Sequence, residues 1–87
     1  MTHEVRYSRQ AANYLRRLDG TAQARMREAI DRLGIEPRAF GTKPLKGAAG
    51  SRALRVGGWR VVYSIDDDHG LVDIKIIAPR GQVYRRL

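Results

Sequence analysis

The stretch SRALRVGGWRVVYSI, residues Ser51–Ile65, decides the fold of this chain. Apolar and polar side chains alternate on either side of Gly57-Gly58, and such a pattern around a two-residue glycine turn is typical of a β-hairpin. The turn also fixes which residues lie opposite each other, and it places Arg55 opposite Arg60. The stretch therefore predicts two antiparallel strands in a defined register.

The two faces of this predicted hairpin differ in chemical character. One face is apolar and is expected to cover the helices; it carries Leu54, Val56, Trp59 and Val61. The other face carries Arg55 and Arg60 side by side, with Ala53 and Val62 beyond them. Two like charges directly opposite each other disfavour strand pairing. Two interpretations follow: the pair holds an anion, or both guanidinium groups extend into solvent at little cost.

The sequence before the hairpin predicts a short strand and two helices. Residues 3–8 alternate as a strand does, and Ser8 is placed to cap a helix that ends near Leu18. Thr21 is placed to cap a second helix over residues 22–33, with Gly34 just beyond its end. The short connection predicts an antiparallel helical hairpin.

The remaining segments are expected to complete one domain over residues 1–87. Residues 36–50 hold the prolines and glycines of a surface loop. Residues 82–85 suit a short edge strand. Residues 71–78 predict a strand whose more apolar face carries Val72, Ile74 and Ile76.

The chain is strongly basic. It has 17 Lys and Arg against 9 Asp and Glu, a formal net charge of +8, and most of the cations are arginines. This balance indicates a polyanion or an acidic protein as partner. Arginine matches phosphate bidentately, although a GC-rich genome would produce the same bias. Lys43 and Lys46 in the predicted loop are candidate phosphate contacts.

Composition and spacing exclude or disfavour several kinds of site. The chain has no cysteine, which excludes disulfides, thiolate nucleophiles and cysteine-bearing zinc sites. The run Asp66–Asp68 lacks calcium-loop spacing and is interpreted as a solvated turn, and His3 and His69 as lone surface residues. We therefore expect no metal and no cofactor. No apolar run approaches the ~18 residues of a membrane span, and we expect a cytoplasmic protein.

Three segments resemble one known family. The segment Lys43–Ile65, KPLKGAAGSRALRVGGWRVVYSI, resembles the K-L-K-G … R-L-R-V-G-x-Y-R-V-I-Y core of the RelE/ParE superfamily of bacterial toxins. The early AANYLRRLD resembles its first helix, and the late IIAPRGQVYRRL its I-x-x-R-x-x-V-Y tail. The resemblance implies an α+β fold, in which an N-terminal strand and a two-helix hairpin pack on one face of a twisted, mainly antiparallel sheet.

The resemblance to the RelE-like branch also implies a function. It implies a toxin of a type II toxin–antitoxin system that cleaves mRNA on the ribosome without a metal ion and thereby inhibits translation. The catalytic positions that carry over are Arg55, Arg60, Arg80 and Tyr84. Further basic residues are candidates for RNA binding: Lys43, Lys46, Arg52, Arg85 and Arg86.

Two residues depart from the family pattern. The position two before Arg55 is often basic in active members and here is Ala53. The residue before the late arginine is often histidine and here is Pro79. Arg52, beside Ala53, is expected on the other face of its strand. Both departures remove groups suited to proton transfer.

The last residues leave two points open. Strict alternation from residue 71 sends Arg80 toward the core side of the sheet, and we expect a bend at Pro79 to bring it to the basic face. Tyr84 lies among Arg80, Arg85 and Arg86. It is either a functional phenol, for proton transfer or base stacking, or an edge-strand aromatic.

Two other functions stay open on the sequence alone. ParE-like chains share the fold and inhibit DNA gyrase through protein contacts, and a relative that binds RNA with weak catalysis would fit the two departures. In either toxin reading, we expect a cognate acidic antitoxin, partly disordered until it folds around the toxin in a hetero-oligomer. The RelE-like reading adds mRNA on the ribosome as the target, and no reading involves a membrane.

Overall fold

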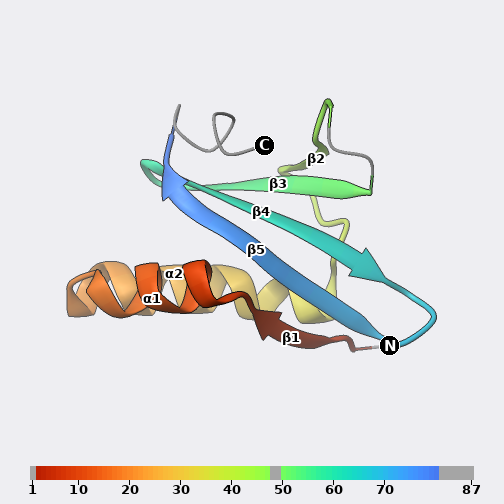
Figure 1. Cartoon of the computed structure of the whole chain (residues 1–87), viewed down its shortest axis with the longest axis horizontal. Helices are drawn as coiled ribbons and strands as arrows, with labels where there is room; N and C mark the ends of the chain where they lie inside the picture. The colour runs from red at the N-terminus through yellow and green to blue at the C-terminus, as the bar shows by residue number, and fades with distance from the viewer. Residues whose placement is uncertain (1, 48–49, 81–87) are drawn as a thin grey trace.

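The computed structural model describes residues 2–47 and 50–80. Along the chain, its elements are β1 (Glu4–Tyr7), α1 (Arg9–Arg17), α2 (Gly20–Ile35), β2 (Thr42–Pro44), β3 (Ser51–Val56), β4 (Trp59–Asp66) and β5 (Leu71–Pro79) (Figure 1). The edge strand predicted over residues 82–85 lies outside the described residues. Neither helix in the described part of the chain combines the length and apolarity needed to cross a bilayer.

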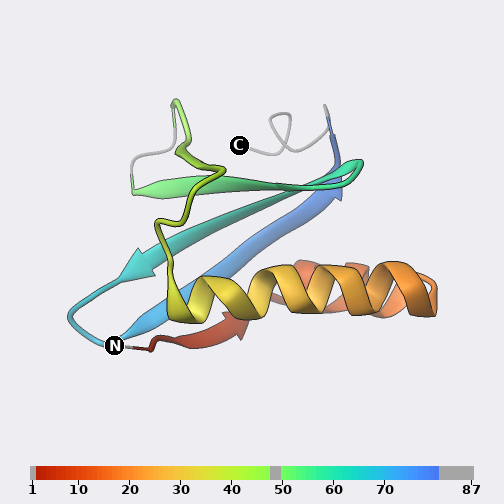
Figure 2. The ribbon, with the colours of Figure 1, turned by 180° about the vertical axis from the view of Figure 1, so that it is seen from behind.

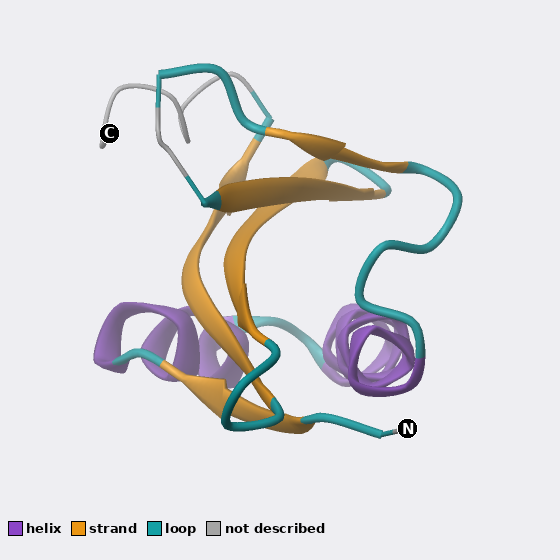
Figure 3. Ribbon diagram, turned by 90° about the vertical axis from the view of Figure 1, so that its right-hand side faces the viewer, coloured by secondary structure: helices purple, strands orange, loops and turns teal. Residues whose placement is uncertain are grey.

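The strands form one sheet in the order β1-β5-β4-β3-β2. β1 runs parallel to β5, and every other neighbouring pair is antiparallel. The sheet is strongly twisted, so that β3 runs across the direction of β5 (Figures 1 and 3). Both helices lie on one side of the sheet, as the reverse view shows (Figure 2). The predicted α+β class and mainly antiparallel sheet are confirmed.

The helix boundaries differ from the predicted ones at α2. Ser8 caps α1 as predicted, and its hydroxyl accepts a hydrogen bond from the backbone N–H of Ala11. Asp19, not Thr21, caps α2, because its carboxylate accepts from the N–H of Ala22 at 2.8 Å. The helix therefore starts earlier than predicted.

Gly34 lies inside α2 rather than beyond its end. Its carbonyl accepts a hydrogen bond from the N–H of His3 at 2.5 Å. A Cβ at Gly34 would lie 2.8 Å from the carbonyl oxygen of His3, closer than real Cβ atoms approach. Glycine is needed here for the close approach of the N-terminal segment.

The main core lies between the helices and the sheet. The apolar face of the β3–β4 hairpin packs on the helices as predicted, with Val56, Val61 and Tyr63 buried and Leu54 and Trp59 partly buried. The helices contribute Ala11, Leu15, Met26, Ile30 and Leu33. Burial of this apolar surface is the main source of stability for a chain of this size.

A β-bulge in β5 changes which of its side chains enter the core. Val62 pairs with Ile76 and Tyr63 with Ile74, so Lys75 has no partner on β4. The extra residue reverses the alternation that follows it. Ile77 is therefore fully buried against the helices, whereas Ile76 packs on the opposite face, and the prediction for Ile76 was wrong.

The segment predicted as a loop over residues 36–50 contains a short edge strand. β2 pairs with β3 in antiparallel register, with Thr42 opposite Leu54 and Lys43 opposite Ala53. The segment is also anchored at its start, because the buried hydroxyl of Tyr63 donates to the carbonyl of Pro37 at 2.5 Å. β2 extends the sheet on the side where the basic residues gather.

Candidate functional site

An arginine pair on β3 and β4 lies on the face of the sheet turned away from the helices. Arg55 lies directly opposite Arg60, as the turn predicted. Gly57 in that turn has φ +59°, a conformation that glycine adopts without strain. The turn chemistry therefore sets the register that places two positive charges side by side.

The bulge at Lys75 brings Arg80 to the same face. After the bulge, Ala78 pairs with Arg60 and Pro79 with Trp59. The backbone N–H of Arg80 then donates to the carbonyl of Gly58 at 2.9 Å, which ties it to the hairpin turn. The reversed alternation, rather than the expected bend at Pro79, puts Arg80 beside the arginine pair.

β2 and the turn after it supply two lysines. Lys43 pairs with Ala53 on β3, and the backbone N–H of Leu45 donates to the carbonyl of Ser51 at 2.8 Å. These contacts fix the backbone on both sides of Pro44. Lys43 and Lys46 therefore stand on the same face as the three arginines.

Together these elements form a surface pocket of about 530 Å³, which we call the basic pocket. Its lining residues are Gly41, Lys43, Pro44, Leu45, Lys46, Ala53, Arg55, Arg60 and Arg80. Five of the lining residues are Lys or Arg, and none of those that the structure describes is Asp or Glu. The pocket is therefore positively charged.

The floor of the basic pocket is apolar. Leu45, Ala53, Val62 and Ala78 form a second buried cluster on this side of the sheet, with Ile76 packed against it. An apolar floor keeps water and its screening away from one side of the pocket, which strengthens the attraction between the cations and a bound anion. The arrangement suits a phosphate group. Ala53, one of the two departures from the family pattern, is part of this floor.

Not every predicted site residue reaches the pocket. Arg52 lies on the other face of β3, as expected, and its Nη2 donates to Thr42 Oγ1 at 2.9 Å. It holds β2 against β3 and does not line the basic pocket. Tyr84, Arg85 and Arg86 lie outside the described residues.

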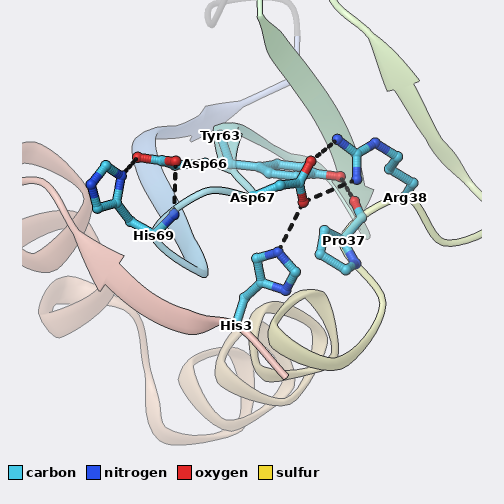
Figure 4. Close-up of polar contacts among 7 residues, drawn as sticks. All are labelled: His3, Pro37, Arg38, Tyr63, Asp66, Asp67 and His69. Atoms are coloured by element: carbon cyan, nitrogen blue, oxygen red, sulfur yellow. Dashed lines mark hydrogen bonds and ion pairs between the residues drawn. The ribbon is translucent and has the colours of Figure 1, made fainter. Parts of the chain in front are cut away.

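The acidic turn between β4 and β5 forms a separate polar cluster (Figure 4). Asp67 accepts hydrogen bonds from Arg38 Nη2 at 2.8 Å and pairs with His3 Nε2 at 3.0 Å. The bond from Arg38, and then that from His3, lowers the pKa of Asp67. Asp66 pairs with the ring of His69, and the bonds from His69 lower the pKa of Asp66.

The prediction that His3 and His69 are lone surface residues was wrong, because each ring pairs with an aspartate of this turn. The Asp66–His69 pair is local, but the partners of Asp67 come from distant parts of the sequence. His3 and Asp67 are 64 residues apart, and Arg38 and Asp67 are 29 apart. None of these residues lines the basic pocket. In the described ranges, no group of three or more His, Asp or Glu side chains is arranged to hold a metal ion. We interpret the cluster as a structural tie between the N-terminal segment, the loop after α2 and the β4–β5 turn.

Comparison with known proteins identifies the family. A family model, the ParE toxin of the type II toxin–antitoxin system parDE, matches residues 5–84. Toxin RelG of Mycobacterium tuberculosis is 33% identical to this chain over 87 residues, which cover 99% of this chain and 100% of that relative.

Solved structures of RelE toxins have the same fold as this chain. One chain of the toxin–antitoxin complex RelBE2 from Mycobacterium tuberculosis has a TM-score of 0.80 at 32% identity, covering 92% of this chain and 100% of that chain. The RelE–RelB complex from Pyrococcus horikoshii gives a TM-score of 0.79 at 29% identity, covering 94% and 99%. The isolated RelE toxin of E. coli shares the fold, with a TM-score of 0.77 at 20% identity over 97% and 93%. The chain therefore belongs to the RelE/ParE superfamily and is a toxin of a type II toxin–antitoxin system.

Proposed function

We propose that this toxin is a ribosome-dependent endoribonuclease that cleaves mRNA without a metal ion and so inhibits translation. The observation that carries the proposal is the basic pocket, in which Arg55, Arg60 and Arg80 converge from three separate segments without a carboxylate among the described lining residues. A cluster of positive side chains of this kind suits a protein that binds an anion.

In the proposed reaction, the 2′-hydroxyl of one nucleotide attacks the adjacent phosphorus. The P–O bond to the 5′ oxygen of the next nucleotide breaks, leaving a 2′,3′-cyclic phosphate and a 5′-hydroxyl. A base takes the 2′-hydroxyl proton and an acid returns one to the leaving oxygen. The three arginines stabilise the charge that develops on the phosphate oxygens.

Tyr84 is the proposed residue for proton transfer or for stacking on a base. A phenol is mostly un-ionised at neutral pH, so the role of a base would need cations close by, and the sequence places Arg85 and Arg86 next to Tyr84. The ribosome would supply the remaining orientation of the substrate. Lys43, Lys46, Arg85 and Arg86 are proposed to bind the RNA backbone. Arg52, predicted to do the same, lies on the other face of β3, and its proposed role is to hold β2 in place.

A second function, inhibition of DNA gyrase, is favoured by one specific finding: the family model that matches this chain is the ParE toxin. A third, RNA binding with weak cleavage, is favoured by Ala53 and Pro79, which replace residues suited to proton transfer. Both use the same fold, and the activity assay below separates them from the first.

The proposed partner is a cognate acidic antitoxin that forms a hetero-oligomer with the toxin in the cytoplasm. The relatives from Mycobacterium tuberculosis and Pyrococcus horikoshii were solved as toxin–antitoxin complexes. A net charge of +8 on this chain complements an acidic segment.

The test is to incubate the purified toxin with mRNA, with and without ribosomes, and to assay gyrase supercoiling in parallel. The proposal predicts cleavage of ribosome-bound mRNA, products that end in a 2′,3′-cyclic phosphate, and unchanged supercoiling. Inhibition of supercoiling with intact mRNA would establish the gyrase function instead. Unchanged supercoiling and little or no cleavage, together with retention of labelled mRNA by the toxin in a filter-binding measurement, would establish the third.

A further inference from the structure

A second cavity lies on the other side of Arg55. It is a groove of about 300 Å³ between α2 and β3, lined also by the loop that leads to β2. Its apolar lining residues are Ala29, Leu33, Ala39, Phe40, Leu54 and Val56. We call it the Phe40 groove. Phe40 is completely exposed, at 106% of its reference area, so its ring is available to a ligand.

The Phe40 groove adjoins the basic pocket at Arg55. Arg55 lines both cavities, and Gly41, the residue after Phe40, also lines the basic pocket. A strand of nucleic acid with one phosphate on Arg55 in the basic pocket would therefore present an adjacent nucleotide to the groove. Arg55 therefore stands between a charged cavity and a partly apolar one.

The loop that carries Phe40 is anchored on both sides of it. Pro37 accepts the hydrogen bond from Tyr63, and Arg38 is paired with Asp67 at 2.8 Å (Figure 4). The carbonyl of Ala39 accepts from both the N–H and the hydroxyl of Thr42, at 3.1 and 2.8 Å. The backbone on both sides of Phe40 is therefore held in place although its ring is exposed, which lowers the backbone entropy cost of binding a ligand.

We propose that Phe40 and its groove bind one nucleobase of a single-stranded RNA whose neighbouring phosphate lies in the basic pocket. This inference rests on the proposed function, because it assumes RNA as the ligand. An exposed aromatic ring stacks on the face of any base. The charged residues that line the groove also suit a nucleic acid backbone. Glu28, its one acidic lining residue among those described, is neutralised by Arg32. Arg25 and Arg55 form no salt bridge with any residue that the structure describes, so both can meet a phosphate.

The alternative occupant is an apolar segment of a protein partner. Such a segment needs apolar contact from Phe40 but not an aromatic face. Phe40→Leu therefore separates the two occupants, since it keeps an apolar side chain and removes the ring. Phe40→Trp keeps a stacking surface. Ile35→Ala is the matched control, because Ile35 is a second exposed hydrophobic residue, at 66%, and lines neither cavity.

The test measures binding of the full chain to a labelled single-stranded RNA at low salt. The RNA carries 2′-O-methyl groups to block cleavage, and a matched series carries one abasic nucleotide at successive positions. We expect Phe40→Leu to bind intact RNA about tenfold more weakly, the size expected for one lost stacked base. Phe40→Trp and Ile35→Ala should bind within about twofold of the parent. One abasic position should weaken the parent by the same factor and leave Phe40→Leu unaffected.

Several results would overturn the inference. If Phe40→Leu binds intact RNA like the parent while the parent still cleaves mRNA on ribosomes, the base site is wrong and the proposed function stands. If Phe40→Leu and Phe40→Ala bind RNA normally but Phe40→Ala loses affinity for the cognate antitoxin, the groove belongs to the protein partner. If the parent neither binds nor cleaves RNA, both the base site and the proposed ribonuclease function are wrong. Binding that depends on Phe40 without cleavage would support the base site and remove the ribonuclease function.

Discussion

Arg55 and Arg60 are direct cross-strand partners on the face of the sheet that the helices do not cover. In the described residues, Arg55 forms no salt bridge; its Nε donates only a long hydrogen bond, 3.4 Å, to the carbonyl of Gly57. Most of the buried apolar side chains that stabilise the fold belong to the main core on the opposite face, and a smaller cluster lies under the basic pocket. Because the main core lies on the other face, residues of the basic face can be changed with little effect on the core.

Neutralising Arg55 should therefore leave the fold intact. We expect Arg55→Gln to keep the free energy of unfolding level, or to raise it by a few tenths of a kcal/mol, because Arg55 forms no ion pair with a described residue that the change would break. The contrasting control is Arg32→Gln, which breaks the 2.8 Å ion pair with Glu28 and should cost about 0.3–0.5 kcal/mol. Urea unfolding measures both. A loss above about 1 kcal/mol for Arg55→Gln would show that the residue is structural.

The bulge at Lys75 predicts opposite roles for two neighbouring isoleucines. Ile77 is fully buried in the main core, so Ile77→Ala should lower the free energy of unfolding by about 2–4 kcal/mol. Ile76 is only partly buried on the other face, and Ile76→Ala should cost about half as much or less. If urea melts rank Ile76→Ala as the more damaging change, β5 has no bulge and Arg80 faces the core.

Ile76 and Ile77 show which part of the sheet could be predicted from the sequence and which could not. The β3–β4 register was predictable because Gly57-Gly58 permits only a tight turn, and that turn determines every pair that follows. The bulge was not predictable, because residues 71–79 alternate equally well without it. Arg80 lies on the basic face as expected, but the bend at Pro79 is not the reason. Val62 pairs with Ile76 and Tyr63 with Ile74, and the bulge between these pairs reverses the alternation that follows.

Other features depend on contacts between distant residues. β2 has only three residues and includes a proline, so it has no periodic signal of its own, and pairing with β3 makes it a strand. The tie between Arg38 and Asp67 has no local signature either. The Phe40 groove was missed for the same reason, because α2 and β3 meet there only in the folded chain.

A side chain at Gly34 should destabilise the fold, although Gly34 lies in a helix. Alanine in a helix interior is ordinarily more stable than glycine by about 0.5–1 kcal/mol. At Gly34, however, the new Cβ would meet the backbone of His3 at 2.8 Å, and we expect Gly34→Ala to cost about 1–3 kcal/mol. Gly20→Ala is the control, since no heavy atom lies within 4 Å of its Cβ position. Equal thermal stability of the two variants would disprove the close approach of the N-terminal segment.

Asp67 should make the stability of the toxin sensitive to acid. Its pKa in the folded chain is lowered below the ordinary 3.8 by the bonds from Arg38 and His3. A depressed pKa contributes stability at pH values above 3.8, and this stability is lost as pH falls through the folded-state pKa. Asp67→Asn removes this contribution. Urea midpoints measured from about pH 5 downward should fall more steeply for the parent than for Asp67→Asn, and parallel curves would contradict the tie.

The rate of mRNA cleavage on programmed ribosomes by pocket variants tests the central claim most directly. Arg55→Gln and Arg80→Gln remove charge from the basic pocket, and Arg9→Gln removes an exposed arginine from α1, on the helical side of the sheet. We predict that each pocket variant loses about 10²-fold or more in cleavage rate while staying folded, because transition-state charge is no longer stabilised, and that Arg9→Gln cleaves within about twofold of the parent. Pocket variants that cleave as fast as the parent would show that the basic pocket does not hold the scissile phosphate.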